Sequence, residues 1–287
     1  MNSTKITTGI DMKGTLRGSD RGPLVAGPIE GESTVNSPKR LARIAGVLYL
    51  AVGIFGAFAQ GFVDLKMYAA SNAAATAGHV VANAGLVRLG VVADLFQATV
   101  WVFLAMTLYL LLKHVNKSAA SAMVVLAAIG ASIVCLNAVF EFEGLRVATG
   151  AVNLAALGTA GSNALVLLLL DTQHYGTLIA QVFFGLWLVA LGYLAYKSSG
   201  MFPKWLGVLL IVGGVCSLVD LLVLVLVPNF GQKITPDLPG THHTFVGVIP
   251  PAIAEISMLV YLLVIGVKTV KTSKPEKSIL DVLPSHV

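Results

Sequence analysis

Six long apolar stretches, separated by short polar segments, make up most of the hydropathy pattern of this chain. A helix needs about 20 apolar residues to cross the roughly 30 Å hydrocarbon core of a bilayer. Six stretches reach that length and predict an all-α fold, a six-helix membrane bundle within residues 41–268. The predicted spans cover residues 44–63, 87–112, 119–140, 176–196, 205–227 and 250–267.

The segments outside the spans differ in character. Residues 1–40 are rich in Gly, Ser, Thr and Pro and lack apolar periodicity, which is typical of a disordered tail, and residues 269–287 form a second tail. Residues 64–86 are too polar to cross and predict a surface loop with some helix. Between the third and fourth spans only seven consecutive residues, Ala164 to Leu170, are apolar. Seven residues cannot cross a bilayer, so they predict a helix lying at the membrane interface.

Two local signals set helix starts. Ser118 follows a short polar turn and is the expected N-cap of the third span, which therefore packs against the second as an antiparallel hairpin. Pro250 and Pro251 are expected to open the last span, because proline suits the first turn of a helix.

Composition places the chain among membrane proteins, with 56% hydrophobic residues, 11% charged residues and a mean hydropathy of +0.84. Of the 19 Lys and Arg residues, seven precede the first span, four lie in the two turns on the same side and four in the C-terminal tail. The other side has only Lys66, Arg88, Arg146 and Lys233. The positive-inside rule therefore predicts cytoplasmic termini, in a multi-pass protein of a bacterial plasma (inner) membrane.

Several function classes lack support. The net charge of +5 comes from residues at span ends, with no basic cluster interleaved with aromatics, so no nucleic-acid partner is expected. The six histidines lie outside the predicted spans, which argues against a haem or a metal centre, and no cofactor is predicted. Cys135 and Cys216 lie in apolar runs and are expected to be small packing residues. Ser217 lacks a nearby base, so no catalytic residue is predicted either.

Polar side chains interrupt the apolar runs. Asp220 is a single carboxylate among about twenty apolar residues, where a charge costs about 2.5–3.5 kcal/mol. It is expected to be protonated, to face other helices, or to line a wet cavity. At a rise of about 1.5 Å per residue, polar residues of the other spans fall at a similar depth, roughly 5–12 Å from the outer surface. The candidate binding layer contains Arg88, Asp94, Gln97, Asn137, Glu141, Gln181, Asp220 and Glu255, with Gln60 at the same depth.

These polar residues are expected to point into the bundle. Gly213, Ser217 and Asp220 share one face at three- to four-residue spacing, and faces of small residues pack against other helices. Arg88 and Asp94 lie six residues apart, about 240° around a helix, so they cannot pair on one face. The expected partner of Arg88 is Glu255 or Glu141 on another span.

Four stretches carry a resemblance to a known family. They read DTQHYGTLIAQVFFGLWLVALGYLAYKSSGMFPKWLGVLL from Asp171, VRLGVVADL from Val87, LYLLLKHVNKS from Leu108 and AEISMLVYLLVIGVK from Ala254. From Arg43 to Lys268 the chain resembles bacterial polytopic membrane proteins of domain of unknown function 4386. The resemblance implies a six-span membrane protein and supplies no catalytic residue.

Two functions remain open at this point. In the first, the polar layer is an outward-facing pocket for a small polar ligand, a cation or a proton. In the second, the chain is a structural or accessory subunit with an unknown protein partner, and each polar residue joins helices by a hydrogen bond of about 1 kcal/mol. An excess of acids over nearby cations favours a pocket, because hydrogen bonding between helices needs no ionisable groups.

Overall fold

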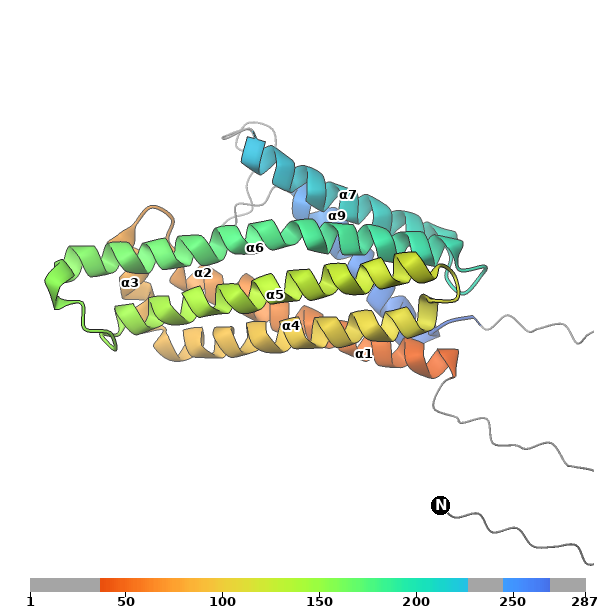
Figure 1. Ribbon diagram of the computed structural model, residues 1–287, viewed down its shortest axis with the longest axis horizontal. Helices are drawn as coiled ribbons and strands as arrows, with labels where there is room; N and C mark the ends of the chain where they lie inside the picture. The colour runs from red at the N-terminus through yellow and green to blue at the C-terminus, as the bar shows by residue number, and fades with distance from the viewer. Residues whose placement is uncertain (1–36, 227–244, 269–287) are drawn as a thin grey trace, which may run out of the picture. The chain divides into compact units, whose positions relative to one another are not determined.

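The computed structural model describes residues 37–226 and 245–268, which are helical apart from short connections and contain no strand (Figure 1). Most of the two predicted tails lies outside the described residues. Six helices are long and apolar enough to cross a membrane in the described part of the chain, which confirms the predicted all-α six-span fold.

The six spans are built from helices of unequal length. In chain order they are α1 (Pro38–Gly56) continued by η2 (Ala57–Val63) and α2 (Asp64–Met67), then α4 (Ala84–Leu112), α5 (Lys117–Ala148), α6 (Gly158–Lys197), α7 (Lys204–Leu226), and α9 (Phe245–Val260) continued by η4 (Tyr261–Ile265). The short helix α3 (Ala73–Ala82) lies between the first two spans, and η3 (Ala155–Leu157) precedes α6. Both η2 and η4 are π-helical turns.

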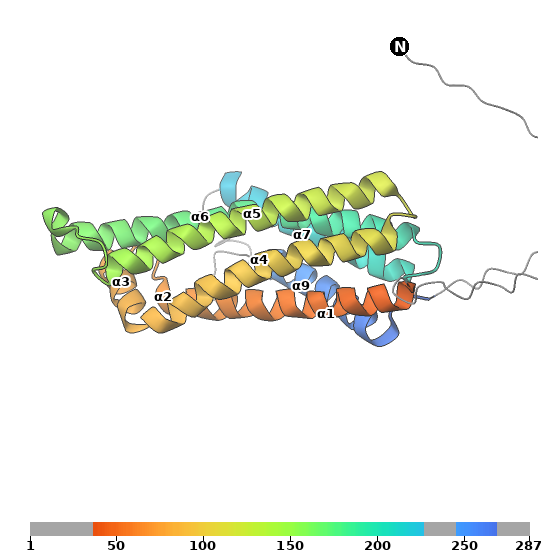
Figure 2. The same cartoon turned by 60° about the horizontal axis from the view of Figure 1, so that its bottom comes forward.

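The bundle has two distinct ends. One, here called the terminal end, holds the start of α1, the turns after α4 and α6, and the end of η4 (Figure 1). There Lys268 N donates to Met201 O at 3.4 Å, and a Cβ on Gly266 would lie 3.8 Å from Lys39 O. The other, the α3 end, holds α2, α3 and the connection between α5 and α6, as both ribbon views show (Figure 2).

The predicted interfacial helix at Ala164–Leu170 is wrong. These residues belong to α6, a single helix of 40 residues that extends for about 60 Å. No proline interrupts α6, and Val166 and Leu170 are buried in an apolar cluster with Leu145 of α5 and Val80 of α3. Packing against α3 and α5 therefore stabilises α6 as a helix longer than the bilayer alone requires.

Two predicted helix starts are also wrong. The N-cap of α5 is Asn116, whose side chain accepts from Ala119 N at 3.0 Å, so the helix begins at Lys117 before Ser118. Pro250 and Pro251 lie inside α9, which begins five residues earlier at Phe245. Proline is tolerated inside membrane helices where neighbouring groups satisfy the freed backbone carbonyls.

Close helix packing depends on paired glycines between α6 and α7. A Cβ at Gly185 would lie 2.9 Å from Gly214 O, and a Cβ at Gly192 would lie 2.7 Å from Gly207 O. Small residues let membrane helices approach backbone to backbone. These contacts fix the antiparallel register of α6 and α7, and with it the depth of the polar residues that both helices carry.

Candidate functional site

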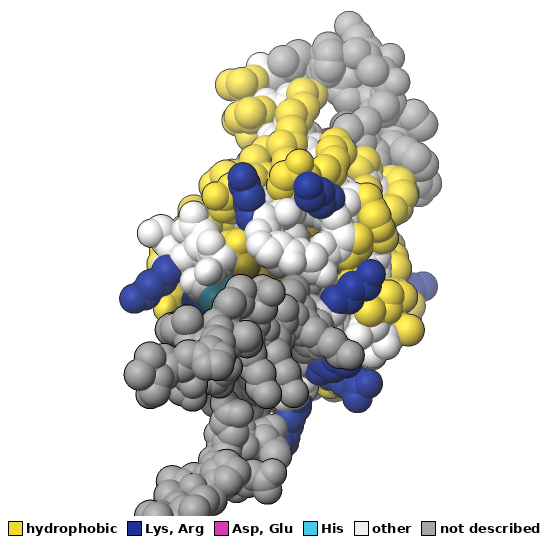
Figure 3. Space-filling model, turned by 90° about the vertical axis from the view of Figure 1, so that its right-hand side faces the viewer, with side chains coloured by type: hydrophobic (Ala, Val, Ile, Leu, Met, Phe, Trp, Pro, Cys, Tyr) yellow, Lys and Arg dark blue, Asp and Glu magenta, His cyan; other side chains and the backbone are white. Residues whose placement is uncertain are grey.

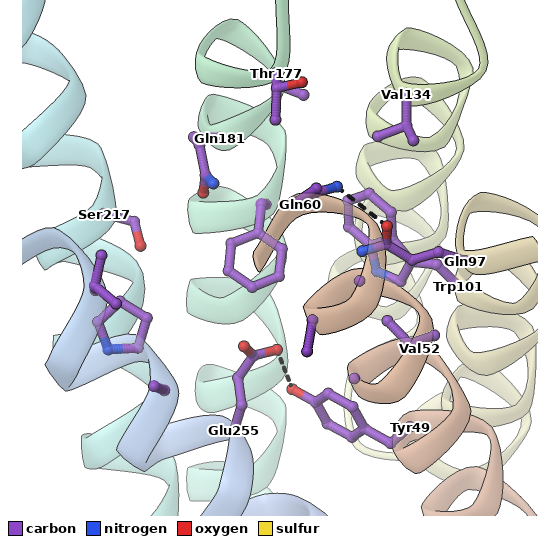
Figure 4. A pocket seen from close by; sticks show the side chains of 18 of the residues that line it. Tyr49, Val52, Gln60, Gln97, Trp101, Val134, Thr177, Gln181, Ser217 and Glu255 are labelled. Atoms are coloured by element: carbon purple, nitrogen blue, oxygen red, sulfur yellow. Dashed lines mark hydrogen bonds between the residues drawn. The ribbon is translucent and has the colours of Figure 1, made fainter. Parts of the chain in front are cut away.

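A cavity of about 510 Å³ lies among the six spans (Figure 4). Its lining residues come from α1, η2, α4, α5, α6, α7 and α9. Three residues of the predicted binding layer line it, namely Gln97, Gln181 and Glu255. Its size falls within the range of about 300–1,000 Å³ that is usual for small-molecule sites.

One side of the cavity carries a carboxylate and a phenol. The Tyr49 hydroxyl on α1 donates to Glu255 Oε1 on α9 at 2.9 Å (Figure 4). Glu255 is the only carboxylate among the described lining residues, which include no Lys, Arg or His. The described lining therefore contains one acidic side chain and no basic one.

Aromatic rings form the adjoining wall. Trp101 and Phe184 line the cavity, and their ring centroids lie 6.0 Å apart. Behind them Trp187 is fully buried, with its ring edge-on to Tyr49 at 5.8 Å and to Trp101 at 5.9 Å. The indole Nε1 atoms of Trp101 and Trp187 are buried and have no hydrogen-bond partner within the described residues.

Amide side chains occupy the α3 side of the cavity. Gln60 Nε2 donates to Gln97 Oε1 at 3.1 Å, joining the first and second spans. Gly56 makes room for this pair, because a Cβ there would lie only 2.5 Å from Gln97 Nε2. Gln60 lies on the π-helical turn η2, and such turns occur often at functional sites.

The predicted single polar layer is wrong for Glu255. Its partner Tyr49 precedes Gln60 by eleven residues on the first span, about 16 Å along the helix, so the Glu255 carboxylate is bound nearer the terminal end than Gln60 is. The predicted depth assumes a helix that begins at Pro250, whereas α9 begins at Phe245. The cavity thus connects two polar levels, Glu255 with Tyr49 at one and the amides at the other.

Asp220 faces other helices rather than lipid. It is 6% exposed and packs against Gly247 of α9, where a Cβ would lie 2.7 Å from Asp220 Cβ. A second cavity of about 10 Å³ separates it from Gln181 and Ser217. That volume is at the lower limit for one water molecule. The prediction that this carboxylate faces other helices is therefore confirmed.

Besides Asp220, four predicted site residues do not line the main cavity. Asn137 is 4% exposed, and its Nδ2 donates to Thr177 Oγ1 at 3.2 Å. Asp94 and Glu141 are buried nearer the α3 end. Arg88 is exposed, and the expected ion pair with Glu255 or Glu141 does not form in the described structure. The one ion pair found there joins Arg146 Nη1 to Glu143 Oε1 at 2.6 Å.

Outside the spans, Tyr68 ties the first connection to α6. Its hydroxyl donates to Asp171 Oδ1 at 2.6 Å, and its ring stacks on His174 at 5.1 Å. Burial, together with the adjacent Asp171 carboxylate, raises the pKa of Tyr68 well above its ordinary value. Tyr68 therefore stays protonated and keeps donating through neutral and moderately alkaline pH.

Sequence reasoning missed Tyr49, Trp101 and Asp64. Tyr49 follows Ala42 and Ala45 on the buried face of α1, whereas the next residue, Leu50, lies on another face and is 40% exposed. A position shift of one residue along the helix separates the two faces by about 100°. The sequence predicts a loop at Asp64, but the helical backbone continues from η2 into α2, and Asp64 is the first residue of α2.

These features define a multi-pass helical membrane protein with a mainly apolar cavity among its spans, into which a few polar side chains point. The sequence model of the family described as Domain of unknown function (DUF4386) matches residues 44–266, and the chain belongs to that family. No curated protein and no solved structure matches the chain.

Proposed function

We propose that the protein binds a small organic cation in the cavity among its spans. The observation that carries this proposal is the Glu255 carboxylate beside an aromatic wall, in a cavity whose described lining includes no cationic side chain. A carboxylate attracts a cation strongly where water is excluded, and aromatic faces add about 2 kcal/mol when the cation is desolvated. An anion would meet only repulsion from Glu255.

The polar part of the lining suits a ligand with hydrogen-bonding groups besides its charge. Gln60, Gln97, Gln181, Thr177 and Ser217 line the cavity on its α3 side, and each can donate and accept. Glu255 and Tyr49 lie at the opposite level. We therefore expect the cationic group next to Glu255 and the hydrogen-bonding groups next to the amides.

We also propose that the terminal end faces the cytoplasm of a bacterial cell and that the membrane is the plasma membrane. The described Lys and Arg residues at the terminal end are Lys39, Arg40, Arg43, Lys113, Lys117, Lys197, Lys204 and Lys268, against Lys66, Arg88 and Arg146 at the α3 end. Figure 3 looks onto the terminal end and shows several Lys and Arg side chains spread over that face. By the positive-inside rule, the amide side of the cavity then points outward.

Benzyltrimethylammonium is a suitable probe, because its neutral isostere neopentylbenzene has the same shape without the charge. Tryptophan fluorescence reports binding in full-length protein reconstituted in nanodiscs, because Trp101 lines the cavity and Trp187 lies against Trp101, while exposed Trp205 adds a constant background. We expect saturable quenching by the cation and none by the isostere. Glu255→Gln should lower the affinity for the cation by about thirtyfold or more, since losing one partner of a buried charge pair costs about 2–5 kcal/mol.

The matched control is Glu143→Gln, which removes an ion-paired carboxylate away from the cavity and should leave probe affinity unchanged. Equal quenching by cation and isostere, or equal affinity of the Glu255→Gln variant and the unaltered protein, would contradict the proposal.

The second candidate is a structural or accessory subunit in which the polar residues only join helices. The bonds from Gln60 to Gln97, from Asn137 to Thr177 and from Tyr49 to Glu255 support it, because each links two spans. Such bonds contribute about 0.6 kcal/mol on average. A flat thermal stability between about pH 5 and 8 without any response to the probe would favour this role.

A further inference from the structure

Three carboxylates approach one another near the α3 end, apart from the described lining of the cavity. Asp64 comes from the start of α2, Asp94 from α4 and Glu141 from α5. Glu141 is 1% exposed and Asp94 4% exposed, while Asp64 is half-buried. All three are close enough to interact electrostatically with one another.

The Glu141 carboxylate reaches from α5 to the backbone of α4. A Cβ at Gly90 would lie 3.2 Å from Glu141 Oε1 and 2.9 Å from the Val63 Cγ1 methyl. Val63 directly precedes Asp64, and Asp94 lies one helical turn beyond Gly90. Glu141 therefore points at the junction of η2, α2 and α4, where the other two carboxylates begin.

Two oxygens of this cluster, Glu141 Oε1 and Asp94 Oδ1, are buried without a hydrogen-bond partner among the residues that the structure describes. The only hydrogen bond to Asp64 from another span comes from Gln173 Nε2 at 3.5 Å, among the described residues. A buried carboxylate that is ionised normally collects several donors. Unpartnered oxygens at these positions fit carboxyl groups that carry a proton.

Counter-charges for the cluster are missing on every packed helix that the structure describes. Lys66 lies over the Phe62 ring, Arg88 is exposed, and Arg146 pairs with Glu143. The other titratable groups on the surrounding helices are exposed His79 on α3, Cys135 on α5, and Asp171, His174 and Tyr175 on α6. Three adjacent negative charges with no cation would repel one another in a site that excludes water.

We propose that Asp64, Asp94 and Glu141 form a proton-binding site that keeps at least one exchangeable proton at neutral pH. A metal ion is a poorer occupant, because no group of three His, Cys, Asp or Glu side chains in the described ranges is placed to hold one. Gln60 lies beside Asp94 and hydrogen-bonds Gln97, and both amides line the cavity. The proton site and the cavity are thus neighbours, although the site is inferred without any ligand in the cavity.

Infrared difference spectra of the full chain in nanodiscs, recorded between pH 6 and 9, test the site directly. The unaltered protein should show a protonated-carboxyl band that disappears as pH rises and shifts in heavy water. Glu141→Gln, Asp94→Asn and Asp64→Asn should each reduce this band, and Glu143→Gln should leave it unchanged. The band persisting at full size in all three amide variants would overturn the proposal, as would its absence from the unaltered protein.

Thermal unfolding gives a second readout. Ordinary aqueous Asp and Glu are ionised above pH 6, so the folded protein binds a proton that the unfolded chain releases, and stability must fall as pH rises. The melting temperature of the unaltered protein should drop by about 2–4 °C or more from pH 6 to 9, and that slope should flatten in Glu141→Gln. A melting temperature that rises with sodium at fixed pH, compared with choline, would mean a metal occupant and would overturn the proposal.

Discussion

Two glutamates inside this bundle, half-buried Glu255 and buried Glu141, have opposite surroundings. Glu255 accepts a hydrogen bond from Tyr49 and faces a cavity, whereas Glu141 Oε1 has no hydrogen-bond partner in the described part of the chain and lies against the backbone of α4 at Gly90. The proposed ligand would reach the first from the cavity. The second lies so close to the Gly90 backbone that even an added Cβ would come within 3.2 Å of its Oε1 atom. Residue type and membrane depth therefore do not decide the role of a carboxylate here, but its partners and free space do.

Removing the donor from the first glutamate is expected to give the largest loss of stability. Tyr49→Phe leaves Glu255 without its hydrogen bond, and bonds to charged groups contribute about 1.5–3 kcal/mol. The unfolding free energy should fall by that amount in a reversible denaturation assay. Glu255→Gln should lose less, because its amide oxygen still accepts from Tyr49. If both variants unfold like the unaltered protein, Glu255 is not held by Tyr49 and the contrast with Glu141 is lost.

Most of the fold could be predicted from the sequence, because bilayer thickness converts apolar length directly into spans. What failed were features set by tertiary packing. Ala164 to Leu170 is too short to span alone, but it packs against α3 and α5 and becomes part of α6. Hydropathy carries no information about such contacts.

The site was predictable only in part. Gln97, Gln181 and Glu255 stood out as polar residues in apolar runs, and all three line the cavity. Tyr49 and Trp101 did not stand out, since aromatic residues are common in membrane helices. The partner of Arg88 was expected inside the bundle, but its long side chain is exposed near the helix end, where arginine can reach the membrane surface.

Filling the space beside Glu141 should lower the unfolding free energy nearly as much as Tyr49→Phe does. Gly90→Ala places a Cβ 2.9 Å from Val63 Cγ1 and 3.2 Å from Glu141 Oε1, and overpacking of this kind costs about 1–3 kcal/mol. The control is Gly85→Ala on the same helix, where a Cβ meets nothing within 4 Å. That change should be neutral or stabilise by up to about 1 kcal/mol. Equal effects of the two variants in thermal unfolding would mean that Glu141 is not confined at Gly90.

A phenol outside the spans provides a contrast in pH dependence. Tyr68→Phe removes the hydrogen bond to Asp171 and should lower the unfolding free energy by about 1 kcal/mol. Because the pKa of Tyr68 is raised above the value in the unfolded chain, this contribution is fully present below that unfolded value and is lost only at higher pH. The loss should be equal at pH 6 and 8. A change with pH over that interval would mean that Tyr68 titrates with the acidic cluster.

The smallest expected effect links the two glutamates through the electrostatic field. Loss of the proton from the Asp64, Asp94 and Glu141 cluster adds a negative charge near the amide side of the cavity. A unit charge about 15 Å away contributes about 1 kcal/mol at an effective dielectric constant of about 20, or roughly fivefold in affinity. Benzyltrimethylammonium should therefore bind up to about fivefold more tightly at pH 9 than at pH 6, measured by tryptophan quenching. The gain should disappear in Glu141→Gln and persist in Glu143→Gln. If the affinity stays constant with pH while the infrared band still titrates, the two sites are independent, and the cavity responds to Glu255 alone.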